Sequence, residues 1–223
     1  MVGMVLGLGW RADRPVEAGS PSAPLTAPTT CGNQVRDPGF EDLFSPWSQS
    51  YANYSPIDNL FPPPFPLWDC PDGTCEVGPN GPAGPRSGVN WAWFGGGITN
   101  TTTSPVTQNV SQSINLSAGT ATLEFYLWVS RADAGVTGND HIRALIDATP
   151  VFTVTATSAG AYTSGYAPVT LDLTPFANGL AHTLSFSATT QAASTSPKPI
   201  ISFNVDDVSV CVTTKTYLPI ITK

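Results

Sequence analysis

Two adjacent carboxylates, Asp206 and Asp207, are the residues whose placement points most directly to chemistry. The apolar residues before them, Ile201, Phe203 and Val205, occupy odd positions, whereas the apolar residues after them occupy even positions. A one-residue shift of this kind predicts a β-bulge, which would gather both acids at the rim of a sheet. Two acids placed together need a partner, and a hard cation such as calcium, bound by carboxylate and backbone oxygens, would serve.

Catalytic chemistry has little support in the sequence. The two histidines, His141 and His182, belong to no recognisable triad or metal motif, and His182 begins a strand-like stretch where a structural histidine is expected. No G-x-S-x-G, P-loop or H-E-x-x-H pattern occurs. A glycosidase needs two facing carboxylates, and nothing sets Glu76 opposite Glu124. The sequence therefore predicts a protein that is not an enzyme.

Four cysteines, an even number, predict disulfides and an oxidising, extracellular setting. Cys70 and Cys75 flank a tight Pro-Asp-Gly-Thr loop, while Cys31 opens the first strand-like segment and Cys211 ends the last strong one. We predict the pairs Cys31–Cys211 and Cys70–Cys75, although the count alone allows other pairings. Zinc is the competing interpretation, but the cysteines are not in C-x-x-C pairs and no histidine lies near them.

The charge of the chain restricts its partners. The formal net charge is −7, the isoelectric point is about 4.5, and the only lysines are Lys198, Lys215 and Lys223. No basic stripe is present to neutralise phosphates, so nucleic acids and anionic membranes are not expected partners. The apolar stretch at residues 1–10 is too short to span a bilayer, so no membrane span is expected either.

The elements that must position these residues are strands. Charged residues make up only 11% of the chain, while glycine and proline number 20 and 22, a turn-rich composition. Apolar residues alternate with others between Leu123 and Val129, and similar alternation recurs near residues 142–146 and 184–188. Turn residues separate these runs, and no long stretch has helical periodicity. We therefore predict an all-β, antiparallel sandwich.

Three parts follow from the composition along the chain. Residues 1–30, rich in Pro, Ala and Ser, predict an extended N-terminal arm, for which a remnant of a signal peptide plus a linker is the alternative. Residues 31–212 form the predicted sandwich, with a Pro-rich and aromatic-rich insert at residues 53–85. Residues 213–223 predict a strand-like C-terminal tail.

Several short motifs occur in order along the chain: DPGFE at 37–41, Trp47, Ser87-Gly88, WAWFGG at 91–96, TQNV at 107–110 and FNVDDV at 203–208. Together they resemble the galactose-binding-like jelly rolls that include calcium-bearing carbohydrate-binding modules. The resemblance spans roughly residues 31–212 and implies a jelly-roll sandwich.

A structural calcium ion is part of what this resemblance implies. Glu41, which follows the first Gly-Phe, and Asp206 would help to hold the ion, with Asp207 and backbone carbonyls beside them. The family usually has Asn-Gly-Gly-Phe-Glu where this chain has Asp-Pro-Gly-Phe-Glu, a departure at the carbonyls of the site.

Sugar binding needs exposed aromatic faces beside polar side chains. The candidates for this role are Phe61, Phe65 and Trp68, which the insert would present on stiff prolines beside the Cys70–Cys75 loop. The same aromatic residues could equally cover a hydrophobic edge of a sandwich. Most of the tryptophans in strand-like stretches are instead expected to pack in the core: Trp47, Trp91, Trp93 and Trp128.

The termini suggest a role in assembly. In the arm, Val2, Met4, Leu6 and Leu8 form an apolar face with a period of two residues, which suits a strand donated to a neighbouring copy, and the tail is the alternative donor. We therefore predict an extracellular structural or adhesive subunit that assembles with copies of itself into a fibre or surface layer. A stand-alone module that binds extracellular polysaccharide is the alternative, and an accessory module of a glycoside hydrolase system comes third.

Overall fold

The computed structural model describes residues 31–42, 46–52, 67–69, 84–95, 105–191 and 199–214. The predicted arm, most of the insert and the tail from residue 215 lie outside the described residues. The predictions that fall there concern Val2, Met4, Leu6 and Leu8 as donor residues, Phe61 and Phe65 as ligand-binding residues, and the Cys70–Cys75 pair.

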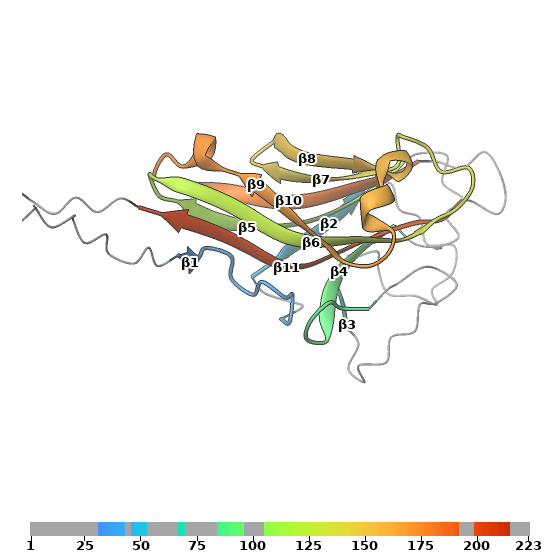
Figure 1. The fold of residues 1–223 in the computed structure, drawn as a ribbon, viewed down its shortest axis with the longest axis horizontal. Helices are drawn as coiled ribbons and strands as arrows, with labels where there is room; N and C mark the ends of the chain where they lie inside the picture. The colour runs from blue at the N-terminus through green and yellow to red at the C-terminus, as the bar shows by residue number, and fades with distance from the viewer. Residues whose placement is uncertain are drawn as a thin grey trace, which may run out of the picture.

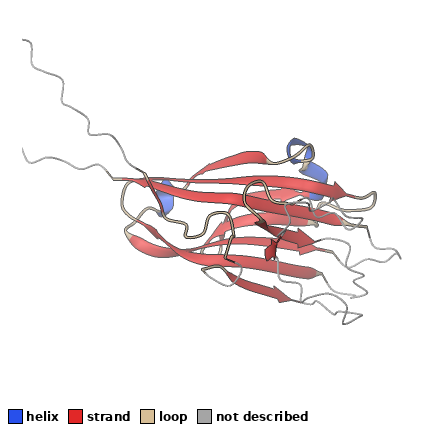
Figure 2. Ribbon diagram, turned by 90° about the horizontal axis from the view of Figure 1, so that it is seen from below, coloured by secondary structure: helices blue, strands red, loops and turns tan. Residues whose placement is uncertain are grey.

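The described chain consists of strands in two sheets, both antiparallel throughout (Figures 1 and 2). The β11 sheet has the order β3-β4-β11-β6-β9, with β1 also paired to β11, and the β10 sheet has the order β2-β5-β10-β7-β8. The bounds of β1 to β6 are Gly32–Asn33, Ser48–Ala52, Leu67–Asp69, Asn90–Gly95, Val106–Leu116 and Thr120–Ala132. Those of β7 to β11 are His141–Ile146, Thr149–Thr155, Ala167–Asp172, Leu180–Thr190 and Ile201–Thr213.

The strand order is that of a jelly roll. From β4 onward each strand crosses to the opposite sheet, except that β7 and β8 form a hairpin within one sheet. The order β4-β11-β6-β9 in one sheet therefore faces β5-β10-β7-β8 in the other, which is the arrangement of two Greek keys. The predicted antiparallel jelly-roll sandwich is confirmed. The only helical elements among the described residues are short 3-10 turns at Ala156–Ser158, Gly160–Tyr162 and Thr174–Phe176.

No helix in the described part of the chain combines the length and the apolar character needed to cross a membrane.

The core lies between the two sheets and follows the period-two pattern of the sequence. In β6 every second residue from Ala121 to Val129 is buried, while the residues between them are only partly buried. Trp47 packs into this core between Phe40 and Phe186, with ring centroids 4.8 and 6.3 Å away, so core packing of Trp47 is confirmed.

Trp91 and Trp93 are buried in a different place. Their neighbours in β4, Ala92 and Phe94, belong to the core, whereas the two tryptophans point to the outer side of the β11 sheet. There the indole Nε1 of Trp91 donates a hydrogen bond of 3.0 Å to Asn204 Oδ1. These tryptophans were expected to pack mostly in the core; they are buried, but outside the layer between the sheets.

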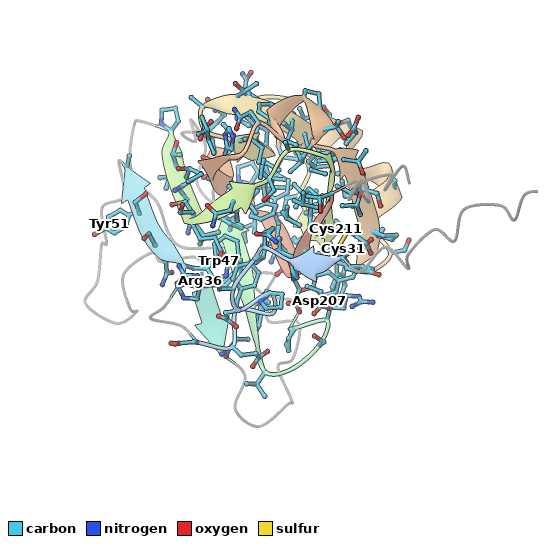
Figure 3. The ribbon with its side chains drawn as sticks, turned by 90° about the vertical axis from the view of Figure 1, so that its left-hand side faces the viewer. Cys31, Arg36, Trp47, Tyr51, Asp207 and Cys211 are labelled. Carbon is cyan, nitrogen blue, oxygen red and sulfur yellow. A yellow bond between two sulfur atoms is a disulfide. The ribbon has the colours of Figure 1, made fainter. Side chains whose placement is uncertain are left out.

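The Cys31–Cys211 disulfide joins the first described residue to the last strand, as predicted (Figure 3). The backbone on either side of the bond is paired as well, because Asn33 lies opposite Cys211 and Gln34 N donates to Val210 O at 2.8 Å. The bond therefore closes nearly the whole sandwich into one loop, with a sequence separation of 180 residues.

His182 is a structural histidine, as the sequence predicted. Its ring is 9% exposed and is held on both sides, with Nδ1 2.9 Å from Asp147 Oδ2 and Nε2 3.0 Å from Asn178 Oδ1. Two hydrogen bonds lower the pKa of the Asp147 carboxyl: the backbone N–H of Thr183 has the larger effect and the His182 ring the smaller one.

Candidate functional site

Three segments that are far apart in sequence meet where the pairing between β11 and β4 ends, next to Val205. They are residues 37–41, residues 86–90 and the bulge at residues 206–208. The bulge is real: the register between β11 and β6 shifts between Asp206 and Ser209, as the slip in the sequence predicted. Its Val208 N donates to Pro38 O at 2.8 Å, which fixes the first segment to the third.

The first segment is a tight turn organised by Asp37. The carboxylate of Asp37 accepts hydrogen bonds from Glu41 N at 2.8 Å and Asp42 N at 3.0 Å, while its carbonyl accepts one from Trp47 Nε1 at 2.9 Å. Asp37 and Phe40 both have positive φ, at 52° and 59°. The motif DPGFE thus shapes a turn that buries Phe40 and presents the side chain of Glu41 to residues 86–90.

Glu41 holds the second segment through its backbone. Its carboxylate accepts hydrogen bonds from Val89 N at 3.1 and 3.2 Å and from Asn90 N at 3.4 Å, and its carbonyl accepts one from Asn90 Nδ2 at 2.9 Å. Gly88 lies so close that a Cβ there would be 1.8 Å from Glu41 Oε1. Glycine is required at position 88 both for this contact and for its φ of 64°.

The sequence predicted both acids at the rim of the sheet, and the structure places Asp206 beneath the second segment. It is fully buried, and its carboxylate accepts hydrogen bonds from the backbone N–H groups of Arg86, Ser87 and Asp207 at 2.7, 3.2 and 2.7 Å. Burial raises the pKa of the Asp206 carboxyl to about 7, against the opposing effect of these donors. The loop that contributes Arg86 and Ser87 covers the strand at this point, which is why the acid is not exposed.

Asp207 faces a cation supplied by the chain itself. The Arg86 guanidinium pairs with Asp207, and Ser87 Oγ donates to the same carboxylate at 2.6 Å. The guanidinium also lies over the ring of Tyr126, with its carbon 3.4 Å from the ring centroid. Arg86 therefore supplies, for Asp207, the positive charge that the sequence led us to expect from a metal ion.

The structure thus brings Glu41, Asp206 and Asp207 around one loop, but in an arrangement that does not fit calcium. Calcium takes six to eight oxygen ligands, whereas these carboxylates receive N–H and O–H donors and a guanidinium. No three His, Cys, Asp or Glu side chains of the described residues are grouped so that they could hold a metal ion. The loop contacts thus explain this cluster without the calcium ion that the resemblance implies, and chelation distinguishes the two explanations.

We expect chelation to leave the stability unchanged. With the cluster neutralised by Arg86 and backbone donors, EDTA should not shift the melting temperature, whereas Arg86→Gln should lower the stability by about 1 kcal/mol, since the pair is partly exposed. That corresponds to about 2 to 4 °C for a chain of this size. Arg36→Gln, on an exposed loop arginine, is the matched control. A melting temperature that falls with EDTA and recovers with calcium would contradict this explanation.

The outer side of the β11 sheet is aromatic next to this cluster. Trp128 and Tyr166 are in edge-to-face contact at 5.6 Å, and Tyr166 Oη donates to Gly84 O at 2.9 Å. Burial raises the pKa of the Tyr166 hydroxyl above its usual range. The backbone register places Trp68, a residue predicted to bind ligand, opposite Trp91 at the edge of the same sheet. Gly84 thus contacts this side of the sheet through its carbonyl.

The outer face of the β10 sheet is built differently. Its outward side chains are mostly serine, threonine and asparagine, arranged in rows that cross all five strands. We call the middle one the central row; the strand register aligns its members, one from each strand: Ser50, Asn109, Ser187, Arg143 and Thr153.

The polar groups of the central row are available to a ligand. Each of the five side chains is at least partly exposed, and none has a hydrogen bond or ion pair with another residue in the described part of the chain. In the neighbouring row that contains Thr107, Thr189 and His141, the polar groups are already engaged. Thr107 Oγ1 and Thr189 Oγ1 are 3.1 Å apart, and His141 Nδ1 donates to Asn139 O at 2.7 Å. The rows on the two sides consist of Ala52, Thr107, Thr189, His141 and Thr155, and of Ser48, Ser111, Ser185, Leu145 and Pro150.

Sequence reasoning did not identify the central row. Its five members lie in four separate stretches of the sequence, since β7 and β8 form one hairpin. Only the pairing of β2, β5, β10, β7 and β8 brings them together. The one local signal is a charged residue, Arg143, in the middle of the apolar strand from Ile142 to Ile146.

Comparison with known proteins gives likeness of fold only. No protein-family description and no curated protein matches the sequence. Among solved structures, the carbohydrate-binding module TmCBM61 in complex with β-1,4-galactotriose is 14% identical, with 80% of this chain and 97% of that chain covered and a TM-score of 0.48. The K3 adhesin domain of Lys-gingipain from Porphyromonas gingivalis is 14% identical, with 82% and 99% covered and a TM-score of 0.49. The tailspike protein 4 domain of bacteriophage CBA120 is 12% identical, with 81% and 21% covered and a TM-score of 0.37.

Proposed function

We propose that this protein is a non-catalytic carbohydrate-binding β-sandwich, and that an extended polysaccharide binds across the outer face of the β10 sheet. The observation that carries the proposal is the central row, with one available polar side chain on each of five adjacent strands. Neighbouring strands are about 4.8 Å apart, close to the length of one sugar ring in an extended chain. A polysaccharide that crosses the strands would therefore meet one polar side chain per sugar.

The chemistry of the row suits sugar hydroxyls. Serine and threonine hydroxyls and the Asn109 amide both donate and accept hydrogen bonds, and the Arg143 guanidinium donates several. Short side chains also lose little rotamer entropy when a ligand fixes them. Because each neutral hydrogen bond contributes about 1 kcal/mol net, a row of this length supports dissociation constants in roughly the millimolar to micromolar range.

An aromatic ring lies beside this face, not on it. Tyr51 is 43% exposed on the edge strand β2, next to Ser50 of the central row. Tyr51 pairs with Gln108 of β5, whose side chain points to the interior, so the Tyr51 ring lies on that same side of β2 and not on the outer face. Because β2 is an edge strand, the ring projects at the edge of the sheet (Figure 3). A polysaccharide that extends past β2 could stack a sugar on this ring.

The disulfide supports an extracellular location for this activity. Structural disulfides persist in oxidising compartments, and Cys31–Cys211 joins the two ends of the sandwich. Assembly into a fibre or surface layer through donated terminal strands stays a prediction, as does a role as an accessory module of a glycoside hydrolase system.

Replacing two members of the central row tests the proposal. Asn109→Ala combined with Ser187→Ala removes two adjacent side chains that make no hydrogen bond to another described residue, so the fold should be unaffected. At about 1 kcal/mol each, the loss should weaken binding roughly thirty-fold. Binding is measured by affinity gel electrophoresis with galactan, xylan, mixed-linkage glucan and polygalacturonate.

The matched control makes the same chemical change on the other sheet. Thr122→Ala combined with Ser209→Ala alters the outer side of β6 and β11 and should leave binding unchanged. If the wild-type protein is retarded by none of the four polymers, or if the control pair weakens binding as much as the row pair, the proposed face is wrong.

A further inference from the structure

Arg143 is the one charged member of the central row, and it is unpaired. It lies in β7 between Ile142 and Ala144, which are buried in the core, so its side chain belongs to the outer face. The Nε atom is buried and has no hydrogen-bond partner, and no described residue forms an ion pair with the guanidinium. A buried donor without a partner is rare in folded proteins and calls for an explanation.

The other arginines of the described residues have ordinary explanations. Arg86 pairs with Asp207, and Arg131 pairs with Asp133 through two hydrogen bonds of 2.8 and 3.1 Å. Arg36 is exposed on a loop, where water solvates it. Among the described arginines, only Arg143 combines a buried donor with a position inside a sheet face.

No acid of the described residues competes for Arg143. Its neighbours across the sheet are Ser187 on β10 and Thr153 on β8, and its neighbours along β7 on the same face are His141 and Leu145. None of these four side chains is acidic, so the guanidinium has no counter-ion among them.

The two acids nearest in sequence are engaged elsewhere. Asp140 accepts hydrogen bonds from Thr137 N and Gln191 N, at 2.7 and 2.8 Å. Asp147, at the other end of β7, accepts them from His182 Nδ1 and Thr183 N, both at 2.9 Å. The guanidinium is therefore an uncompensated cation in a protein whose net charge is −7.

We propose that Arg143 selects an acidic polysaccharide, by seating the oxyanion of one sugar while the neutral side chains of the central row bind the sugars on either side. This inference rests on the proposed function and specifies its ligand class. A guanidinium presents a planar set of donors that matches a carboxylate or sulfate group. The flanking serine, asparagine and threonine side chains can bind the hydroxyls that acidic and neutral sugars share.

The net charge of the protein sharpens this expectation. An acidic protein repels an acidic polymer at long range, so a preference for the acidic polymer must come from a local cation. Added salt screens exposed charges, so the preference should shrink as the ionic strength rises.

The experiment compares polymers that differ only in the anionic group. The pairs are polygalacturonate with its methyl ester, which tests a carboxylate, and dextran sulfate with dextran, which tests a sulfate. We expect the wild-type protein to bind one acidic polymer at least about ten-fold more tightly than its neutral partner, as a charge-assisted hydrogen bond allows. Arg143→Gln should abolish the preference, and Arg143→Lys should retain part of it, because lysine keeps the charge without the planar donor set.

Arg36→Gln is the matched control, because it removes the same charge away from the sheet face and should keep the preference. Equal binding to both members of each pair, or a preference that survives in Arg143→Gln, would overturn the inference while leaving polysaccharide binding itself intact. Loss of the preference in Arg36→Gln would also overturn it, because net charge and not Arg143 would then be responsible. Failure of the proposed function is distinct: the wild-type protein would bind no polymer, or binding would be indifferent to Asn109→Ala with Ser187→Ala.

Discussion

Removing the Cys31–Cys211 disulfide should lower the free energy of unfolding by about 5 kcal/mol on the chain-entropy account. The bond closes a loop with a sequence separation of 180 residues, so its loss frees nearly the whole unfolded chain of the sandwich. The first strand adds little by itself, because β1 pairs with β11 over only Gly32 and Asn33. Urea unfolding of the variant with both cysteines replaced by serine measures the effect as a shift in midpoint at constant slope.

The chain offers its own control for this prediction. Cys70 and Cys75, predicted to pair, would close a loop of a few residues, and replacing both by serine should cost only about 2 kcal/mol on the same account. Equal losses for the two pairs, or a loss below about 2 kcal/mol for Cys31 and Cys211, would contradict the entropic explanation.

Asn204→Ala should lower the free energy of unfolding by about 2 to 4 kcal/mol. The fully buried amide of Asn204 accepts a hydrogen bond from Trp91 Nε1 and donates to Trp128 O at 3.1 Å and Ser130 Oγ at 2.9 Å. Alanine would leave the indole N–H of Trp91, a residue only 1% exposed, without an acceptor. Denaturant unfolding of the variant provides the measurement, and indole fluorescence reports the change around Trp91.

Ser209→Ala is the control on the same strand, since Ser209 is half-buried and its side chain makes no hydrogen bond with another described residue. It should change the stability by less than about 0.5 kcal/mol. An Asn204→Ala variant as stable as Ser209→Ala would mean that the buried amide does not organise the aromatic side of the β11 sheet.

The strands and the bulge were predictable because their signals are local. The alternation from Leu123 to Val129 fixes which face of β6 is buried, whatever its partners are. The slip at Asp206 is equally local, since a change of phase in one strand requires a bulge there. The structural role of His182 was also predictable, because the sequence offers it no catalytic motif. The structure agrees, since Asp147 and Asn178 hold its ring.

The neutralisation of the acids was not predictable from the same residues. Arg86 lies about 120 positions before Asp207 in sequence, and only the packing of its loop against β11 pairs them. The sequence showed two acids that need a cation, but not that the chain supplies one. The buried position of Asp206 has the same origin, because the loop residues Arg86 and Ser87 cover it.

The central row was beyond sequence reasoning for a stricter reason. Ser50, Asn109 and Ser187 look like ordinary polar residues of half-buried strands, and a shift of one residue in any pairing would turn one of them to the other face. The row exists only through the registers of four strand pairs. The aromatic insert looked like a better ligand site because its composition is visible without any pairing.

The location of bound ligand tests the central claim most directly. Backbone amide NMR spectra of the labelled protein, titrated with galactan and polygalacturonate oligosaccharides, report which residues sense a sugar. We predict that the shifted amides cluster on β5, β10 and β7 around Asn109, Ser187 and Arg143, while those around Trp128 and Asn204 stay in place. Shifts that cluster around Trp128 and the loop at residues 86–90, with none along the central row, would contradict the claim that this protein binds polysaccharide on the outer face of the β10 sheet.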